Sequence, residues 1–167
     1  MKGGAQMRRI ISAALVLLLV FSLFSCSPAP KAEEMLSDFL YTYGIEGIIY
    51  SPSIPEGGDG YITEELFDKI YIYEGSLPKN CAIFLNTRTD KYVECAIFVT
   101  ESEEERAAIT DMCTERIALI DKSGDSSFIL RSGAIVFYST LPDKERARSV
   151  IDKILGSYTW LFIGYNI

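Results

Sequence analysis

Two runs of β-forming residues, 81–86 and 92–99, constrain the fold of this chain more than any other feature. The polar stretch between them, Thr-Arg-Thr-Asp-Lys, is typical of a hairpin turn. If the turn is centred on Arg88, Cys81 faces Cys95. A slip of one residue would mix the apolar residues of the two faces, so the pattern favours this register or one offset by two. The sequence therefore predicts an antiparallel hairpin whose apolar face comprises Cys81, Ile83, Leu85, Val93, Cys95, Ile97 and Val99.

A long helix is predicted to follow this hairpin. Ser102-Glu103-Glu104-Glu105 has the pattern of a capping box, with a hydroxyl at the cap and a carboxylate three residues later. The helix should run to about residue 120, and we expect it to lie against Ile97 and Val99, on the face of the sheet opposite Glu94. Its apolar residues recur at helical spacing, and the predicted buried stripe is Ile109, Met112, Cys113, Ile117 and Ile120.

A second hairpin and a last helix are predicted further along the chain. Residues 128–131 and 134–140 are rich in β-forming residues and flank Ser132-Gly133, a pair suited to a two-residue turn. Residues 142–143 begin the last helix, and Gly156 is expected to end it. The stripe that this helix should bury is Ala147, Val150, Ile151, Ile154 and Leu155.

Two further amphipathic helices are predicted in the first half of the chain. Residues 33–43 should form a helix that ends at Gly44, and Thr63 should cap a second helix. Between them we expect a short strand at 48–50 and a loop rich in proline and glycine. The two apolar stripes are Leu36, Phe39, Leu40 and Tyr43, and Leu66, Phe67, Ile70 and Tyr71.

The predicted core order is strand, strand, helix, strand, strand, helix. With short hairpins and segregated helices, this order is typical of an α+β fold. We expect an antiparallel sheet of about four strands with the helices packed on one face, in a single domain that comprises residues 33–167. The closing run, 158–167, is strongly apolar, and we expect it to dock against the domain as an additional strand.

The first 25 residues have the organisation of an export signal. Lys2, Arg8 and Arg9 supply positive charge, and residues 10–24 follow as fifteen residues without charge. That run is shorter than the roughly 20 residues needed to span a bilayer, which favours a signal peptide over a resident membrane helix. An ordinary secretory signal and an uncleaved anchor are the alternatives.

The end of this run resembles the lipobox of bacterial lipoproteins. Leu23, Ser25 and Cys26 fit that motif, whereas Phe24 stands where a small residue is commoner. The resemblance implies that a diacylglyceryl group is attached to Cys26 and that cleavage removes residues 1–25. Two acyl chains give a stable anchor, so we expect the protein on the extracytoplasmic face of the cell membrane.

The part of the chain that remains after cleavage is strongly acidic. Residues 26–32 would form a lipid-anchored tether, and cleavage would remove three of the 16 basic residues, which leaves 13 against 23 acidic ones and a net charge of about −10. Such a surface repels phosphate backbones and anionic lipid headgroups. We therefore expect no nucleic-acid partner.

The chain contains no histidine, and this absence narrows the chemistry that we expect. It removes the commonest general base and the commonest metal ligand. No Gly-rich phosphate loop and no paired CxxC motif is present either, because the glycines of residues 57–60 follow prolines and are typical of a loop. We predict no enzyme activity, no cofactor and no metal.

Three cysteines remain besides Cys26: Cys81, Cys95 and Cys113. Each lies within an apolar run, where a free cysteine acts as a small hydrophobic residue. An exported protein can instead form a disulfide, and the predicted hairpin register makes a bridge between Cys81 and Cys95 conceivable. Both interpretations are open from the sequence.

Three segments together resemble a known family: residues 94–100 (Glu-Cys-Ala-Ile-Phe-Val-Thr), 112–120 (Met-Cys-Thr-Glu-Arg-Ile-Ala-Leu-Ile) and 130–137 (Leu-Arg-Ser-Gly-Ala-Ile-Val-Phe). With the final helix, they look like the lipoproteins of Firmicutes grouped as domain of unknown function forty-three fifty-eight. The resemblance covers about residues 63–156. It implies the same location and the same α+β domain, and it carries over no activity and no catalytic residue. Cys81 and the aromatic run after the last helix are not features of that family.

Glu94, Arg116 and Arg131 are the candidate binding residues. Glu94 lies within an apolar strand, so we expect it to pair with an arginine, either as a structural ion pair or in a binding site. Six tyrosines of the first half could line a partner surface or cover the core. They are Tyr41, Tyr43, Tyr50, Tyr61, Tyr71 and Tyr73.

Three functions fit these observations. The first is a non-catalytic interaction or ligand-binding module that meets a cell-envelope protein or ligand, anchored to the membrane through Cys26. The second is a carboxylate-dependent cell-envelope hydrolase that draws a pair of acidic residues from the loop 56–65. The third is a purely structural lipoprotein. The sequence favours the first.

Overall fold

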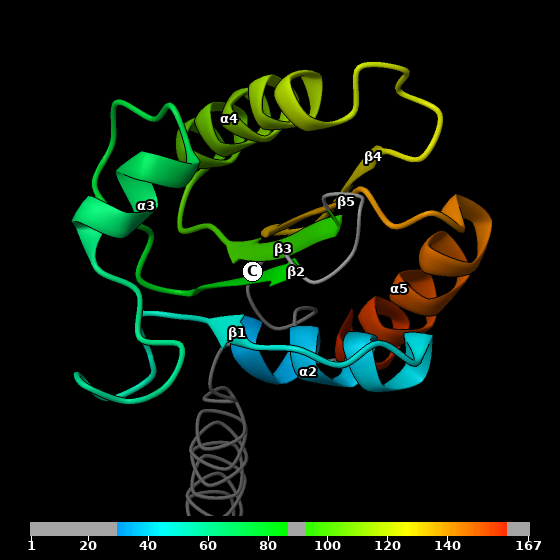
Figure 1. The fold of residues 1–167 in the computed structure, drawn as a ribbon, viewed down its shortest axis with the longest axis horizontal. Coiled ribbons are helices and arrows are strands. Elements are labelled where there is room, and N and C mark those ends of the chain that lie inside the picture. The colour runs from blue at the N-terminus through cyan, green and yellow to red at the C-terminus, as the bar shows by residue number, and fades with distance from the viewer. Residues whose placement is uncertain (1–29, 87–92, 160–167) are drawn as a thin grey trace, which may run out of the picture. The chain divides into compact units, whose positions relative to one another are not determined.

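A five-stranded antiparallel sheet lies at the centre of the computed structural model, which describes residues 30–86 and 93–159 (Figure 1). The strand order is β1-β2-β3-β5-β4. The α+β class is confirmed, and the sheet has five strands instead of four because β1 pairs with β2. The strands are β1 (Ile49–Tyr50), β2 (Cys81–Asn86), β3 (Val93–Val99), β4 (Phe128–Ser132) and β5 (Ile135–Ser139).

Four helices accompany the sheet in the described part of the chain: α2 (Ala32–Tyr43), α3 (Glu64–Ile70), α4 (Glu103–Ile120) and α5 (Lys144–Thr159). None of them is long and apolar enough to cross a membrane. The predicted signal peptide and lipidation site, the turn of the first hairpin and the closing run from residue 160 lie outside the described residues.

The register predicted for the first hairpin is wrong. Cys81 pairs with Phe98, and Cys95 pairs with Phe84, so the partner of Cys81 lies three positions from the predicted one. An odd shift exchanges the two faces of a strand, and Cys81 and Cys95 therefore lie on opposite faces. The thiols of Cys81, Cys95 and Cys113 are all free, so of the two interpretations left open by the sequence, free cysteines and a bridge between Cys81 and Cys95, the structure has the first.

The prediction that the helices pack on one face of the sheet is also wrong, because both faces are apolar and both are covered. Figure 1 shows α4 on one side of the sheet and α2 with α5 on the other. On the first side, Ile109 of α4 and Phe67 of α3 pack in one core with Phe98 of β3. On the second side, the ring of Phe39 in α2 contacts that of Phe137 in β5, with 5.0 Å between ring centroids.

Helix α4 begins as the capping box predicts. The Ser102 hydroxyl accepts a hydrogen bond from the Glu105 amide at 3.1 Å. Of the predicted stripe, Ile109, Met112 and Cys113 are buried, whereas the two isoleucines of the last turns are only partly buried. The helix does not cover Ile97 and Val99 as predicted. It lies on the opposite face, which also carries Glu94.

The predicted bounds of the other elements are mostly confirmed. Gly44 ends α2 in a left-handed conformation (φ 80°), and the Thr63 hydroxyl caps α3 by accepting a hydrogen bond from the Leu66 amide at 3.2 Å. The turn of the second hairpin is shifted by one residue, since Ser132 pairs with Ile135 and Gly133 takes the positive φ of 56°. Helix α5 buries its predicted stripe.

At both ends of the described chain, the observed boundary differs from the predicted one. Helix α5 continues through Gly156 to Thr159, because the Tyr158 hydroxyl reaches Asp38 of α2 and holds the last turn against that helix. At the other end, Pro30 and Ala32 are buried. They belong to the folded domain and not to the tether.

Candidate functional site

The Glu94 carboxylate is the centre of a polar network inside the apolar core. Glu94 lies in β3, and its side chain has no exposed surface. Its strand turns alternate residues toward α4, so the carboxylate faces that helix and not solvent. A buried ionised carboxylate is costly unless it is paired and hydrogen-bonded, and the surrounding residues supply both.

Arg116 of α4 pairs with this carboxylate as predicted. Its Nε donates to Oε1 of Glu94 at 2.9 Å, and its Nη2 donates to Oε2 at 2.6 Å. Two parallel hydrogen bonds of this kind combine charge with a fixed geometry. Because the Arg116 side chain is only 15% exposed, water screens the pair weakly.

Two tyrosines complete the network. The Tyr138 hydroxyl of β5 donates to Oε1 of Glu94, and the hydroxyls of Tyr138 and Tyr71 share a hydrogen bond of 2.6 Å. The Arg116 guanidinium also lies over the Tyr71 ring, 5.9 Å from its centroid. Tyr71 follows directly after α3, so four separate segments of the chain contribute side chains to one network.

Burial and the charge of Glu94 together set the protonation states of the two tyrosines and the arginine. Burial, and then the negative charge of Glu94, raises the pKa of Tyr71 well above its usual value of 10.0. Burial also raises the pKa of Tyr138, with Tyr71 and Glu94 adding to the effect. Burial alone lowers the pKa of Arg116, but its hydrogen bonds with Glu94 and the charge of Glu94 outweigh burial and raise it. At neutral pH the tyrosines are therefore neutral donors and the arginine is a cation.

The network is suited to holding the core together. Each Glu94 oxygen already accepts from Arg116, and one also accepts from Tyr138. Among the described residues, no buried side-chain nitrogen or oxygen lacks a hydrogen-bond partner. The geometry therefore favours the structural ion pair over a binding site for Glu94 and Arg116.

Arg131, the third candidate binding residue, does not join this network. It lies exposed on β4 and pairs with Val136 of β5. Strand β5 separates it from β3 in the sheet. Sequence reasoning instead missed Tyr138, because a tyrosine within an apolar strand is equally common in an ordinary core.

The carboxylates proposed for the hydrolase alternative lie at the surface. Glu56, Asp59, Glu64 and Glu65 are all exposed. Glu65 pairs with Lys69 one helical turn away, at 2.7 Å. No group of three or more residues of metal-ligating type gathers in the described part of the chain.

The six predicted tyrosines do not share one surface. Tyr41 on α2 is 89% exposed, whereas Tyr71 is 2% exposed in the core. The other four are partly buried. The tyrosines therefore divide between the core and its margins.

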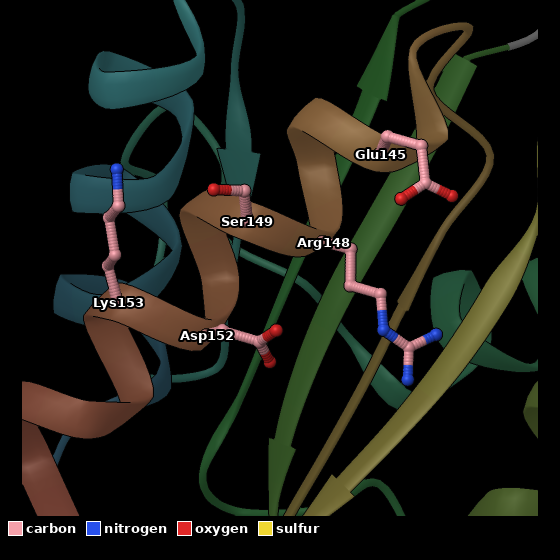
Figure 2. A pocket seen from close by; sticks show the side chains of 5 residues that line it. All are labelled: Glu145, Arg148, Ser149, Asp152 and Lys153. Carbon is pink, nitrogen blue, oxygen red and sulfur yellow. The ribbon is translucent and has the colours of Figure 1, made fainter.

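A shallow hollow lies on the surface of α5. Figure 2 shows the five residues that line it, all from this one helix, with side chains that point in different directions. They are Glu145, Arg148, Ser149, Asp152 and Lys153. The Arg148 guanidinium is turned to the Phe128 ring, 5.7 Å from its centroid. This arrangement is typical of a solvated helix face.

The buried thiols are poor nucleophiles. Burial raises the pKa of Cys81 to about 12, and burial also raises the pKa of Cys95 and Cys113, with a smaller effect from the charge of Glu94. Because the thiolate is the reactive form, these residues act as apolar core side chains at neutral pH.

Comparison with known proteins identified no relative. No family model matches the chain, and no curated protein or solved structure matches it. The resemblance to the lipoproteins of Firmicutes therefore stays a prediction.

Proposed function

We propose that this protein is a lipoprotein anchored through Cys26 to the extracytoplasmic face of the cell membrane, where its domain acts as a non-catalytic interaction or ligand-binding module. The observation that carries the proposal is the lipobox-like end of the signal, Leu-Phe-Ser-Cys at residues 23–26. It follows a positive start and an uncharged run of fifteen residues, which is too short to span a bilayer.

The start of the folded domain supports an anchor at this position. The Asn80 side chain accepts a hydrogen bond from the Ala32 amide at 2.8 Å and donates one to the Pro30 carbonyl at 3.1 Å. The fold thus begins only four residues after Cys26. An anchor there would hold the domain near the membrane without a membrane-binding surface of its own.

The non-catalytic role is supported by the engagement of the Glu94 carboxylate with Arg116 and Tyr138. Candidate contact points for a partner are the large apolar side chains that remain exposed in the described residues. They are Tyr41, Ile48, Ile72 and Leu119. Covering such surface on binding contributes about 25 cal/mol per Å² of apolar area.

The anchor can be tested by metabolic labelling with a fatty acid that carries a chemical tag. We expect the wild-type protein to take up the label and the Cys26→Ala variant to lose it and to accumulate as the larger precursor. Cys81→Ala, which changes a buried thiol, is the matched control and should keep the label. Normal labelling and size of the Cys26→Ala variant would end the lipoprotein proposal.

The interaction role can be tested by photo-crosslinking in intact cells. A photoreactive residue is placed in turn at Tyr41, Ile48, Ile72 and Leu119, and at exposed Thr114 as a polar control. We expect a discrete crosslinked product from an apolar position and none from the control. Equal products at all positions, or none at any, would argue against the module.

The hydrolase alternative is tested separately with cell-wall glycan as the probe. Release of glycan fragments by the wild-type protein, and its loss on Glu56→Gln or Asp59→Asn substitution, would favour that alternative.

A further inference from the structure

The two edges of the sheet differ, because the chain covers one and leaves the other open. At the edge formed by β1, the segment around Tyr61 returns alongside Ser51. The Ser51 amide donates to the Gly60 carbonyl at 2.9 Å, and the Ile62 amide donates to the Ser51 carbonyl at 3.4 Å. These bonds occupy the outer backbone groups of Ser51, directly after β1, where another strand would otherwise pair.

At the other edge, the hydrogen bonds of β5 show which backbone groups of β4 are in use. The Ala134 carbonyl accepts from the Thr100 amide, and the Thr140 amide donates to the Glu94 carbonyl, each at 2.8 Å. Alternate residues of a strand bond to opposite neighbours, so the even-numbered residues of this run bond toward β3. Residues 135, 137 and 139 therefore bond toward β4, where their register partners are residues 132, 130 and 128.

Ile129 and Arg131 of β4 consequently turn their backbone N–H and C=O groups away from the sheet. Nothing in the described part of the chain bonds to these groups. Strand β4 is also the last strand on this side of the sheet. An edge strand with unpaired N–H and C=O groups is a template for the addition of another strand.

Two arginines flank this open edge, one on each face of the sheet. Arg131 pairs with Val136, which packs in the core on the α4 side, so Arg131 belongs to that face. On the other face, Arg148 extends from α5 to the ring of Phe128, 5.7 Å from its centroid (Figure 2). Both arginines are exposed, and neither forms an ion pair with a residue of 30–86 or 93–159.

These arginines select the chemistry of an added strand. The chain has 23 acidic and 16 basic residues, so two unpaired arginines at one edge run against its overall charge. A second copy of the chain would bring the same arginines to the edge and another acidic domain beside it, and like charges repel. A strand that carries carboxylates meets both arginines with opposite charge.

We propose that the β4 edge binds an extended acidic segment of another protein, which adds a sixth strand to the five-stranded sheet. The backbone of the segment bonds to Ile129 and Arg131. Because Arg131 and Phe128 lie three residues apart, about 10 Å along the strand, their side chains point to opposite faces. Two carboxylates three residues apart in the segment likewise point to opposite faces, one to Arg131 and one to Arg148. The inference rests on the proposed interaction role, for which it names a surface and a partner class, and not on the anchor.

The experiment measures binding of a fluorescently labelled peptide, Thr-Glu-Val-Thr-Glu-Val-Thr, to the full-length protein in a nonionic detergent. Fluorescence anisotropy follows binding, and amide hydrogen exchange measured by NMR locates it. We expect saturable binding and slower exchange of the Ile129 and Arg131 amides, because hydrogen bonds to the added strand protect them from exchange. The absence of saturable binding, or unchanged exchange at both residues, overturns the proposal.

Backbone methylation of the peptide separates strand addition from simple attraction between charges. Alternate residues of an added strand turn their N–H groups toward β4, so the peptide is N-methylated on one alternate set of residues or on the other. We expect one set to abolish binding and the other to leave it intact. Equal effects of the two sets would overturn strand addition.

Charge variants test the two arginines. Arg131→Gln and Arg148→Gln should each weaken binding by about twofold to fivefold, the range for one exposed ion pair. Arg146→Gln is the matched control on α5, because the Arg146 guanidinium lies over the Tyr43 ring of α2, 5.0 Å from its centroid. Equal binding by all three variants would overturn the choice of an acidic partner.

Further outcomes separate this inference from the proposed function. Photo-crosslinks from the exposed apolar positions in cells, without peptide binding in detergent, would overturn the edge site and leave the interaction role. Absence of both would overturn both. A dimer of the protein alone in sedimentation, with the Ile129 and Arg131 amides protected, would assign the edge to a second copy and overturn the acidic partner.

Discussion

Replacement of Arg116 by alanine should destabilise the fold by about 3–5 kcal/mol, because it leaves a buried carboxylate without a counter-charge. Glu94 is fully buried, and Arg116 is its cationic partner. Two unit charges about 4 Å apart interact by about 4 kcal/mol at the effective dielectric constant of about 20 that suits such sites. Domains of this size are stable by roughly 5–15 kcal/mol, so the substitution should remove a large part of the total.

The assay is equilibrium unfolding in urea, followed by far-ultraviolet circular dichroism. Lys69→Ala is the matched control, because it breaks an exposed ion pair with Glu65 and should change stability by no more than about 0.5 kcal/mol. Adding Glu94→Gln to Arg116→Ala should recover part of the lost free energy of unfolding, since the double variant has no unpaired buried charge at this position. An Arg116→Ala variant as stable as Lys69→Ala would refute the reasoning.

Further predictions concern burial at other positions. Ile109→Ala should cost about 2–5 kcal/mol in the same assay, whereas Ile117→Ala, at a partly buried position, should cost less; equal losses would contradict the observed packing. Because burial raises the pKa of Tyr71 and Tyr138 above 10.0, the native state holds these protons more tightly than the unfolded chain. The resulting stabilisation is complete below about pH 10 and is lost as the pH rises above it, and Tyr71→Phe should flatten this decline in an alkaline unfolding series. Since the pKa of Cys81 is raised to about 12, its thiol should react with an aromatic disulfide reagent at pH 8 only after unfolding; rapid reaction of the folded protein would exclude the observed burial.

The first hairpin shows why the elements could be predicted from the sequence but their register could not. An alternation of apolar and polar residues specifies the register when one face of a strand is buried and the other is exposed to solvent. Here Ile83 and Phe84, which point to opposite faces, are both fully buried. A shift of three residues therefore exchanges one apolar set for another. What selects the register is the helix that covers each face, and that is a tertiary property.

One part of the polar network around Glu94 could also be predicted from the sequence, and another part could not. The pairing of Glu94 with Arg116 could be predicted, because a carboxylate in an apolar strand needs a counter-charge and the following helix supplies one. The role of Tyr138 in the network could not be predicted, because a tyrosine is also common in an ordinary core. Its contact with Glu94 depends on β5 lying beside β3. The continuation of α5 beyond Gly156 likewise depends on a tertiary contact, that of Tyr158 with Asp38.

The side chain of Asn80 has a mechanical consequence for a domain held by one end. It binds the chain at both Pro30 and Ala32, and the backbone carbonyl of Asn80 accepts a hydrogen bond from the Val99 amide at 2.9 Å. If the domain is pulled away from an anchor at Cys26, tension enters the fold at this clamp and passes to the junction of β2 and β3. The first turn of α2 is thereby shielded from peeling, and the load is carried by the central strands.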